Sequence, residues 1–302
     1  MFASVEDVQY RFRDAKYIAS RRISTVVYLA ERMGRPVLIE GPAGVGKTEL
    51  AKTLSEITKR PLIRLQCYEG LDEGKALYEW KYAKQLLYTQ LLRDRIGELI
   101  KDTPSLPDAV AKIAGQDDAF FSYRFLSARP LLSAIIAEDP VVLLVDEIDK
   151  AEPEFEAFLL EVLSDFQVSV PELGTIRAKH IPLVVLTSNN ARELSDGLKR
   201  RCLHLFIDFP APAEELEIIR MKVPEIPDQL ARSVVDAVQK IRGLDLRKPP
   251  SVSESLDWAR SLVILNATRL DAALVESTLT MLVKYEKDLD RVKGALDKVL
   301  AV

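Results

Sequence analysis

The stretch Gly41-Pro42-Ala43-Gly44-Val45-Gly46-Lys47-Thr48 decides the fold of this chain. It fits the pattern G-x-x-x-x-G-K-[ST], in which glycines without a Cβ let consecutive backbone N–H groups curl around phosphate oxygens. A short apolar run at residues 36–40 precedes it and indicates a buried strand, while residues 48–59 carry apolar side chains at helical spacing. The alternative is a glycine-rich turn that only caps a helix, and the flanking strand and helix argue against it.

This loop predicts a site for a nucleotide and magnesium. The helix N-terminus adds partial positive charge, Lys47 reaches the β and γ phosphates, and the Thr48 hydroxyl ligates magnesium. The sequence therefore predicts ATP and Mg²⁺ as cofactors. The expected nucleotide-binding residues are Gly41, Pro42, Ala43, Gly44, Val45, Gly46, Lys47, Thr48 and Glu49.

A second strand predicts the rest of the metal site. Residues 141–145 are uninterrupted apolar residues, and Asp146 and Glu147 follow them. The carboxyl ends of parallel strands meet at one edge of a sheet, which places both carboxylates beside the glycine loop. Asp146 is expected to hold the magnesium shell with Thr48, and Glu147 to orient or deprotonate the attacking water. Alone, two acids ending a strand are weak evidence, but beside the loop they favour hydrolysis.

Two further polar segments are candidate functional sites, and the first of them follows a strand to the same sheet edge. Residues 183–186 form an apolar strand that runs into Thr187-Ser188-Asn189-Asn190, which is either a functional group or an ordinary polar turn. Leu198-Lys199-Arg200-Arg201 ends a predicted helix. Its basic residues either favour the negative end of the helix dipole or include an arginine that reaches a neighbouring subunit's γ-phosphate.

The alternation of strands and helices predicts an α/β fold with a parallel sheet sandwiched by helices, followed by an all-α domain. Amphipathic helices are expected over residues 14–32 and 74–101, and the second precedes a polar connection around Pro104, Pro107, Gly115 and Asp118. From residue 214 to 300 the chain reads as helices separated by prolines. The expected domains are a nucleotide-binding core at 1–209 and a helical lid at 210–302.

Composition narrows the class of protein. A formal net charge of −4, from 42 basic and 46 acidic residues, gives no overall attraction to nucleic acid or to an anionic membrane. Cys67 and Cys202 lie far apart and are expected to be buried thiols, without a disulfide or zinc site. An N-terminus with acidic residues and the lack of a long apolar run predict a cytoplasmic protein without a membrane span.

Taken in order, these motifs resemble those of an AAA+ ATPase, and the branch they resemble is MoxR. Residues 156–166 and 170–178 are similar to the MoxR helix and the hairpin before sensor 1. The phrases at 65–73, 77–80 and 248–258 resemble the CoxD-like subgroup. The similarity extends from about residue 14 to residue 282.

The resemblance implies roles for matching positions. Asn189 would be sensor 1, and Arg200 or Arg201 would be the arginine finger, which acts in trans and so implies a ring, expected to be a homo-hexamer. Tyr17 and Ile18 would lie near the adenine. MoxR members act as chaperone-like ATPases with a von Willebrand factor A domain partner, and CoxD-like members are associated with maturing a molybdenum-containing carbon monoxide dehydrogenase, so the expected client is a metalloenzyme.

One position departs from the family pattern. Residues 251–255 read Ser-Val-Ser-Glu-Ser where a sensor 2 arginine is expected, so that role falls to Arg247 or is absent. The long spacing between Lys47 and Asp146 indicates an insertion after the second strand.

Two other functions stay open besides a remodelling ATPase. A DNA-acting motor would usually carry a basic stripe or an added nucleic-acid module. This chain is acidic, and the expected core and lid account for almost all of its length, which argues against that function. A nucleotide-dependent assembly switch with little turnover would not need Glu147 or a finger arginine.

Overall fold

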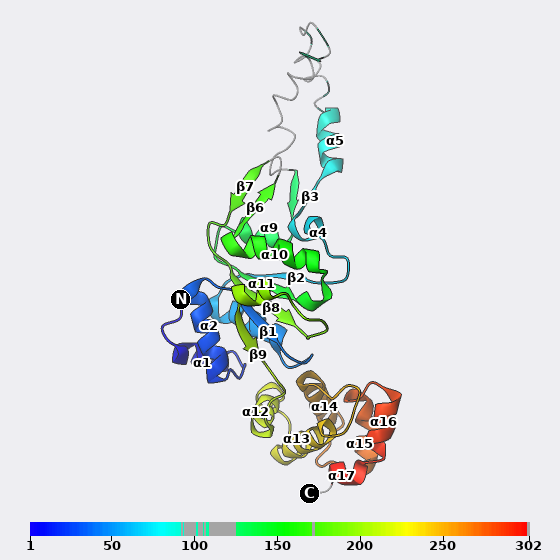
Figure 1. Cartoon of the computed structure of the whole chain (residues 1–302). Coiled ribbons are helices and arrows are strands. Elements are labelled where there is room, and N and C mark those ends of the chain that lie inside the picture. The colour runs from blue at the N-terminus through cyan, green and yellow to red at the C-terminus, as the bar shows by residue number, and fades with distance from the viewer. Residues whose placement is uncertain are drawn as a thin grey trace.

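The computed structural model describes residues 1–91, 93, 101, 105, 107–108, 125–170 and 173–300. Its centre is a parallel five-stranded sheet in the order β2-β5-β8-β1-β9 (Figure 1). The expected α/β fold with a helical C-terminal region is confirmed. The strands are β1 (Val37–Glu40), β2 (Leu62–Gln66), β5 (Val142–Asp146), β8 (Leu183–Ser188) and β9 (Leu203–Phe206).

Side chains alternate between the two faces of the sheet, and each face has its own apolar core. Along β5, Val142 and Leu144 belong to one cluster, and Leu143 and Val145 belong to the other. The first cluster is covered by α1 (Val5–Asp14), α2 (Arg21–Met33) and α3 (Lys47–Thr58). The second is covered by α4 (Glu73–Leu77), α9 (Pro130–Ile135), α10 (Pro153–Asp165) and α11 (Asp196–Arg201). Burial on both faces explains why β1, β5 and β8 read as continuous apolar runs.

Strand β9 is an addition to the strands expected from the sequence. It pairs with β1 in parallel, and the Leu203 N–H donates to the Pro36 carbonyl at 2.7 Å. Leu205 is buried, whereas His204 and Phe206 are exposed. This alternation is the pattern of a strand at the edge of a sheet.

The prediction of one helix over residues 14–32 is wrong. Helix α1 ends at Asp14, and Lys16 adopts a left-handed backbone with φ 57°. Helix α2 begins after Ser20, whose hydroxyl accepts the Ile23 N–H and so provides an N-cap. Tyr17 lies in the segment between the helices, and its ring packs against Phe12 of α1, 5.3 Å away between ring centroids.

The prediction of one helix over residues 74–101 is also wrong. Helix α4 ends at Leu77, because β3 (Tyr78–Trp80) pairs antiparallel with β4 (Leu126–Ala128) and buries Trp80. Helix α5 (Tyr82–Leu91) follows and projects away from the sheet (Figure 1). The rest of this predicted helix, apart from residues 93 and 101, and the connection at Pro104, Gly115 and Asp118 lie outside the described residues.

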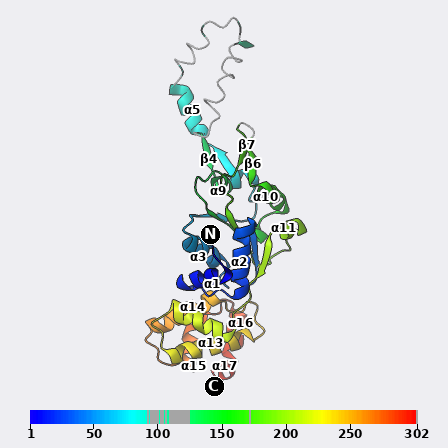
Figure 2. The ribbon, with the colours of Figure 1, turned by 90° about the vertical axis from the view of Figure 1, so that its left-hand side faces the viewer.

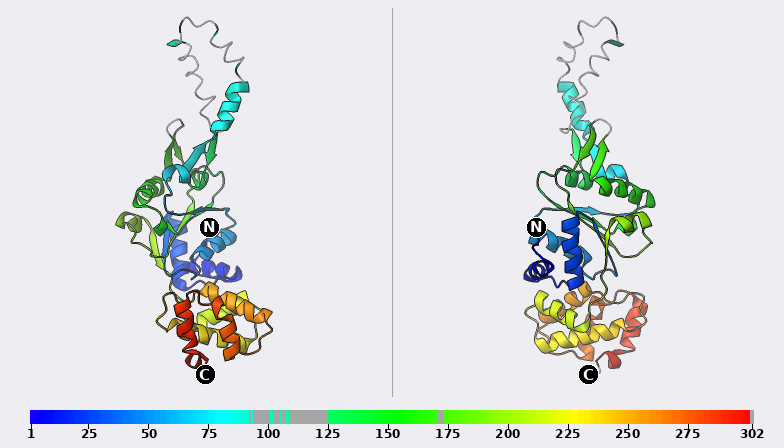
Figure 3. Two further views of the ribbon diagram at one scale, coloured as in Figure 1. Left: turned by 90° about the vertical axis from the view of Figure 1, so that its right-hand side faces the viewer. Right: turned by 60° about the vertical axis from the view of Figure 1, so that its left-hand side comes forward.

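A hairpin precedes β8, at the place where the MoxR resemblance implies one. Strands β6 (Gln167–Val170) and β7 (Gly174–Arg177) pair antiparallel, and residues 171 and 172 between them lie outside the described part. Figures 2 and 3 show this hairpin and α5 at one end of the molecule and the C-terminal helices at the other.

The C-terminal region from residue 212 is helical and has its own apolar cluster around Trp258, whose indole N–H donates to the Thr278 hydroxyl at 2.8 Å. The proposed boundary at residue 210 stays a prediction. No helix of the described residues is both long and apolar enough to cross a membrane. The elements are α12 (Pro212–Lys222), α13 (Asp228–Arg242), α14 (Val252–Ile264), α15 (Ala272–Thr278), η2 (Leu279–Met281), α16 (Glu286–Lys293) and α17 (Leu296–Leu300).

A buried ion pair joins the first helices of this region. The side chains of Arg242 and Glu215 are 8% and 0% exposed, and two guanidinium nitrogens lie 2.7 Å from the two carboxylate oxygens. Ser255 and Gln239 donate to the same carboxylate at 2.9 and 2.8 Å. Since both charges of this pair are hydrogen-bonded, the network fixes how α12, α13 and α14 pack.

Candidate active site

The glycine loop joins β1 to α3 at the carboxyl edge of the sheet. Gly41 and Gly44 both have positive φ, at 149° and 74°. A Cβ on Gly41 would lie 1.9 Å from the Ile207 carbonyl oxygen, and one on Gly44 would lie 2.3 Å from the Ser251 hydroxyl. Both positions therefore need glycine, because the loop adopts left-handed backbone and packs tightly against following segments.

Lys47 is buried at the start of α3 and points back over the loop. Its ammonium donates to the carbonyls of Gly41 and Pro42 at 2.6 and 2.7 Å, and to Asn189 Oδ1 at 2.8 Å. Burial lowers the pKa of Lys47, and the nearby carboxylates of Asp149, Asp146 and Glu147 oppose this effect. The side chains of Lys47 and Asn189, which are far apart in sequence, are thus hydrogen-bonded to each other.

Asp146 ends β5 and is almost fully buried. Its Oδ1 accepts the Thr48 hydroxyl at 3.0 Å and the Thr187 hydroxyl at 2.6 Å. Its Oδ2 accepts from Arg64, whose Nη2 lies 2.6 Å away. The two residues expected to hold magnesium are therefore in contact. Arg64 and the role of Thr187 were missed from the sequence, which carries no signal of contacts across strands.

Glu147 follows with φ 57°, a left-handed conformation in which its N–H donates to the Thr187 hydroxyl at 2.9 Å. The carboxylate accepts from Asn189 Nδ2 at 3.2 Å, from Gln66 Nε2 at 2.9 Å and from Lys150 Nζ at 2.7 Å. The hydrogen bond to Glu147 raises the pKa of Lys150. Gln66 ends β2 and was also missed from the sequence.

Asp149 fixes the loop that carries Asn189. Its Oδ2 accepts the backbone N–H groups of Asn189 and Ala191 at 3.1 and 2.9 Å, and the side chain is buried. The sequence signal for this role was the third acid of Asp146-Glu147-Ile148-Asp149. The amide of Asn189 is thereby held between Lys47 and Glu147.

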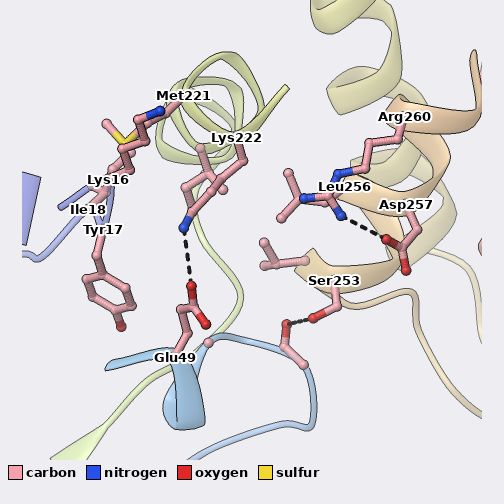
Figure 4. A pocket seen from close by; sticks show the side chains of 14 residues that line it. Lys16, Tyr17, Ile18, Glu49, Met221, Lys222, Ser253, Leu256, Asp257 and Arg260 are labelled. Atoms are coloured by element: carbon pink, nitrogen blue, oxygen red, sulfur yellow. Dashed lines mark hydrogen bonds and ion pairs between the residues drawn. The ribbon is translucent and has the colours of Figure 1, made fainter. Parts of the chain in front are cut away.

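A cavity of about 270 Å³ adjoins this cleft (Figure 4). It lies between the segment after α1, the loop, α12 and α14, and it shares Gly44, Gly46, Glu49 and Ser253 with the cleft around Lys47. Tyr17 and Ile18 line it, as do Ile218, Met221, Leu256, Asp257 and Arg260. Dashed lines in Figure 4 mark the Glu49–Lys222 pair, at 3.2 Å, and the Asp257–Arg260 pair, at 3.1 Å.

Residues 36–202 match the family model described as AAA domain (dynein-related subfamily). This chain belongs to that AAA family. It is similar to the chaperone protein ClpB of Bacillus cereus (strain ATCC 10987 / NRS 248), 26% identical over 162 residues, which are 53% of this chain and 14% of that protein. ClpB 2 of Parasynechococcus marenigrum is 31% identical over 160 residues, 52% of this chain and 14% of the relative. The chain thus spans a small part of these relatives' length.

Among solved structures, the chain is similar to a mutant of RuvB from Thermotoga maritima, at 18% identity and a TM-score of 0.48. That alignment covers 92% of this chain and 70% of the other.

The two candidate finger arginines of the AAA domain lie away from its own cleft. Arg200 and Arg201 are exposed at the end of α11, and neither is among the described residues that line the cleft around Lys47. The Arg35 guanidinium donates to the carbonyls of Arg200, Arg201 and Cys202 at 2.7, 3.2 and 3.3 Å. The helix end that presents the arginines is thereby tied to the residues just before β1.

Arg247, the candidate for sensor 2, also lies elsewhere. Its guanidinium lies over the Tyr285 ring at 4.3 Å, and its backbone N–H donates to Asp288 at 3.0 Å. Instead, Ser253 at the start of α14 reaches the loop of the AAA domain. Its backbone N–H donates to the Gly44 carbonyl at 3.3 Å, and its hydroxyl at 3.4 Å.

Proposed function

We propose that this AAA domain binds ATP with magnesium and hydrolyses it. The observation that carries the proposal is the convergence of Lys47, Thr48, Asp146, Glu147 and Asn189 in one hydrogen-bonded cleft. Asp146, Glu147 and Asn189 lie at the ends of β5 and β8, and Lys47 and Thr48 begin the helix that follows the loop after β1. This edge of an open α/β sheet is where ligands bind.

The loop and α3 bind the phosphates in this proposal. The N-terminus of a twelve-residue helix offers backbone N–H groups and partial positive charge. Lys47 exchanges the carbonyls of Gly41 and Pro42 for phosphate oxygens. The remaining nucleotide-binding residues are proposed to be Ala43, Val45 and Glu49 with the glycines, and the base occupies the cavity beside Tyr17 and Ile18.

The oxygens of Thr48 and Asp146 suit a hard cation. A hydroxyl and a carboxylate 3.0 Å apart are the ligand types that magnesium takes beside phosphates. When bound, magnesium neutralises charge on the β and γ phosphates. Glu147 would orient and deprotonate the attacking water, and Asn189 would hold that water or the γ-phosphate in line.

Assembly and client are further parts of the proposal. Arg200 and Arg201 are exposed outside their own cleft, which suits an arginine that acts on a neighbour in a homo-hexameric ring. The resemblance to MoxR and its CoxD-like subgroup favours a cytoplasmic remodelling ATPase with a von Willebrand factor A domain partner and a metalloenzyme client. The word chaperone in the names of the ClpB relatives agrees with remodelling.

The division into a core at 1–209 and a lid at 210–302 is also proposed. It is supported by the separate apolar cluster of the C-terminal helices. The lid would close over the base, since α12 and α14 line that cavity.

The test measures the steady-state rate of ATP hydrolysis with magnesium for the wild-type chain and for Lys47→Ala. The molar mass of each assembly is measured in parallel by light scattering. We expect turnover that rises with assembly and that the substitution abolishes. A well-folded chain that binds ATP without turnover would instead support the assembly switch.

A further inference from the structure

The side chain of Arg64 lies on the carboxylate proposed for the magnesium shell. Nη2 and Nε of Arg64 lie 2.6 and 3.1 Å from Oδ2 of Asp146. The other oxygen of Asp146 already accepts the hydroxyls of Thr48 and Thr187. The Thr48 hydroxyl also lies 3.3 Å from Oδ2, so both oxygens of Asp146 have protein partners, and the only charged partner among these is the Arg64 guanidinium on Oδ2.

The register of the sheet produces this contact. Gln66 is the partner of Asp146 in the β2–β5 pair, and Arg64 is the partner of Leu144. Side chains two residues apart on a strand share a face, so Arg64 and Asp146 are diagonal neighbours. Strand β2 is at the edge of the sheet, and the Arg64 side chain is 48% exposed while that of Asp146 is 2% exposed. Arg64 can thus leave toward solvent without opening the core.

We propose that Arg64 competes with magnesium for Asp146, so that its withdrawal sets the magnesium concentration that nucleotide binding requires. Two cations beside one carboxylate repel each other, and the guanidinium is the one on a long, half-exposed side chain. This inference rests on the proposed function, because it assumes that Asp146 faces the metal of a bound nucleotide.

Arg64 also connects the carboxylate of Asp146 to that of Glu147, by way of Gln66. Its Nη2 donates to Gln66 Oε1 at 2.6 Å, and Gln66 Nε2 donates to Glu147 at 2.9 Å. Withdrawal of Arg64 from Asp146 removes one partner of Gln66 as well. Arg64 is therefore a positioning residue for both ends of the site.

The test is a magnesium titration of binding of a fluorescent ATP analogue to the full chain. Arg64→Gln removes the charge, and Arg64→Lys retains it. Arg129→Gln is the matched control, because the Arg129 side chain is 47% exposed and pairs with Glu79 outside the cleft.

We expect Arg64→Gln to lower the half-saturating magnesium concentration by about fivefold, the scale of a partly exposed ion pair, with Arg64→Lys and Arg129→Gln close to wild type. An unchanged midpoint in Arg64→Gln, or an equal drop in Arg64→Lys, overturns the inference. So does a loss of affinity that persists in EDTA, which would show that Arg64 contacts the nucleotide. Failure of the wild-type chain to bind nucleotide would refute the proposed function itself, and the inference with it.

Discussion

Replacing Arg242 by methionine should destabilise the C-terminal helices strongly. Methionine fills similar volume but leaves the fully buried Glu215 with only the neutral donors of Ser255 and Gln239. Breaking a buried pair by removing one partner costs about 3–5 kcal/mol. With a urea slope of about 1.5 kcal/mol per molar for this many helices, the unfolding midpoint should fall by about 2 M or more.

The assay uses the fluorescence of Trp258, which is fully buried among these helices. The chain has two tryptophans, so a Trp80→Phe background leaves Trp258 as the single reporter. Arg232→Met is the matched control, because it removes an exposed ion pair with Asp228 on the same helix.

The reasoning is refuted if Arg242→Met shifts the midpoint no more than Arg232→Met does. The double variant Arg242→Met with Glu215→Gln provides a second check. It should recover part of the lost stability, because no uncompensated charge is then buried. Strictly additive losses would show that the pair does not act as a unit.

Three further outcomes are expected. Glu147→Gln should keep ATP binding but lower turnover by about 100-fold or more, since the amide cannot take a proton from water. Alanine at Arg200 or at Arg201 should abolish turnover if that residue is the proposed arginine finger, and mixing with Glu147→Gln subunits should then restore part of it. Burial raises the pKa of Cys67 and of Cys202 to about 12, so both folded thiols should stay protonated at about pH 8 and react slowly with a disulfide reagent.

Each of these outcomes has a result that would contradict it. Unchanged turnover in Glu147→Gln would remove that residue from catalysis. If neither arginine variant is rescued by mixing, neither Arg200 nor Arg201 acts as a finger between subunits. The thiol prediction fails if both cysteines react in the folded chain as fast as they do in denaturant.

The sheet and the centre of the site were predictable because their signals are local. A glycine loop between a strand and a helix, and acids directly after the apolar run that became β5, need only neighbouring residues to be recognised. Strand β9 gave a weaker signal, since an exposed edge strand of four residues shows only a short alternation. The helix predicted over residues 14–32 failed because the Ser20 cap and the turn at Lys16 outweigh an amphipathic pattern that continues through them.

The partners of the Asp146 and Glu147 carboxylates were not predictable. Arg64 and Gln66 reach Asp146 and Glu147 only because β2 lies beside β5 in one register. A shift by one residue would turn both side chains to the opposite face. That register follows from packing of the whole sheet, and the sequence of β2 alone does not contain it.

The contact between α14 and the glycine loop should tolerate most substitutions during evolution. Ser253 donates its main-chain N–H to the Gly44 carbonyl, and every residue except proline carries that group. A substitution at position 253 by any residue other than proline therefore retains the main-chain hydrogen bond. The hydrogen bond between the loop and α14 depends on the main chain, so most substitutions at residue 253 retain it. Ser253→Pro would remove it, because proline has no backbone N–H.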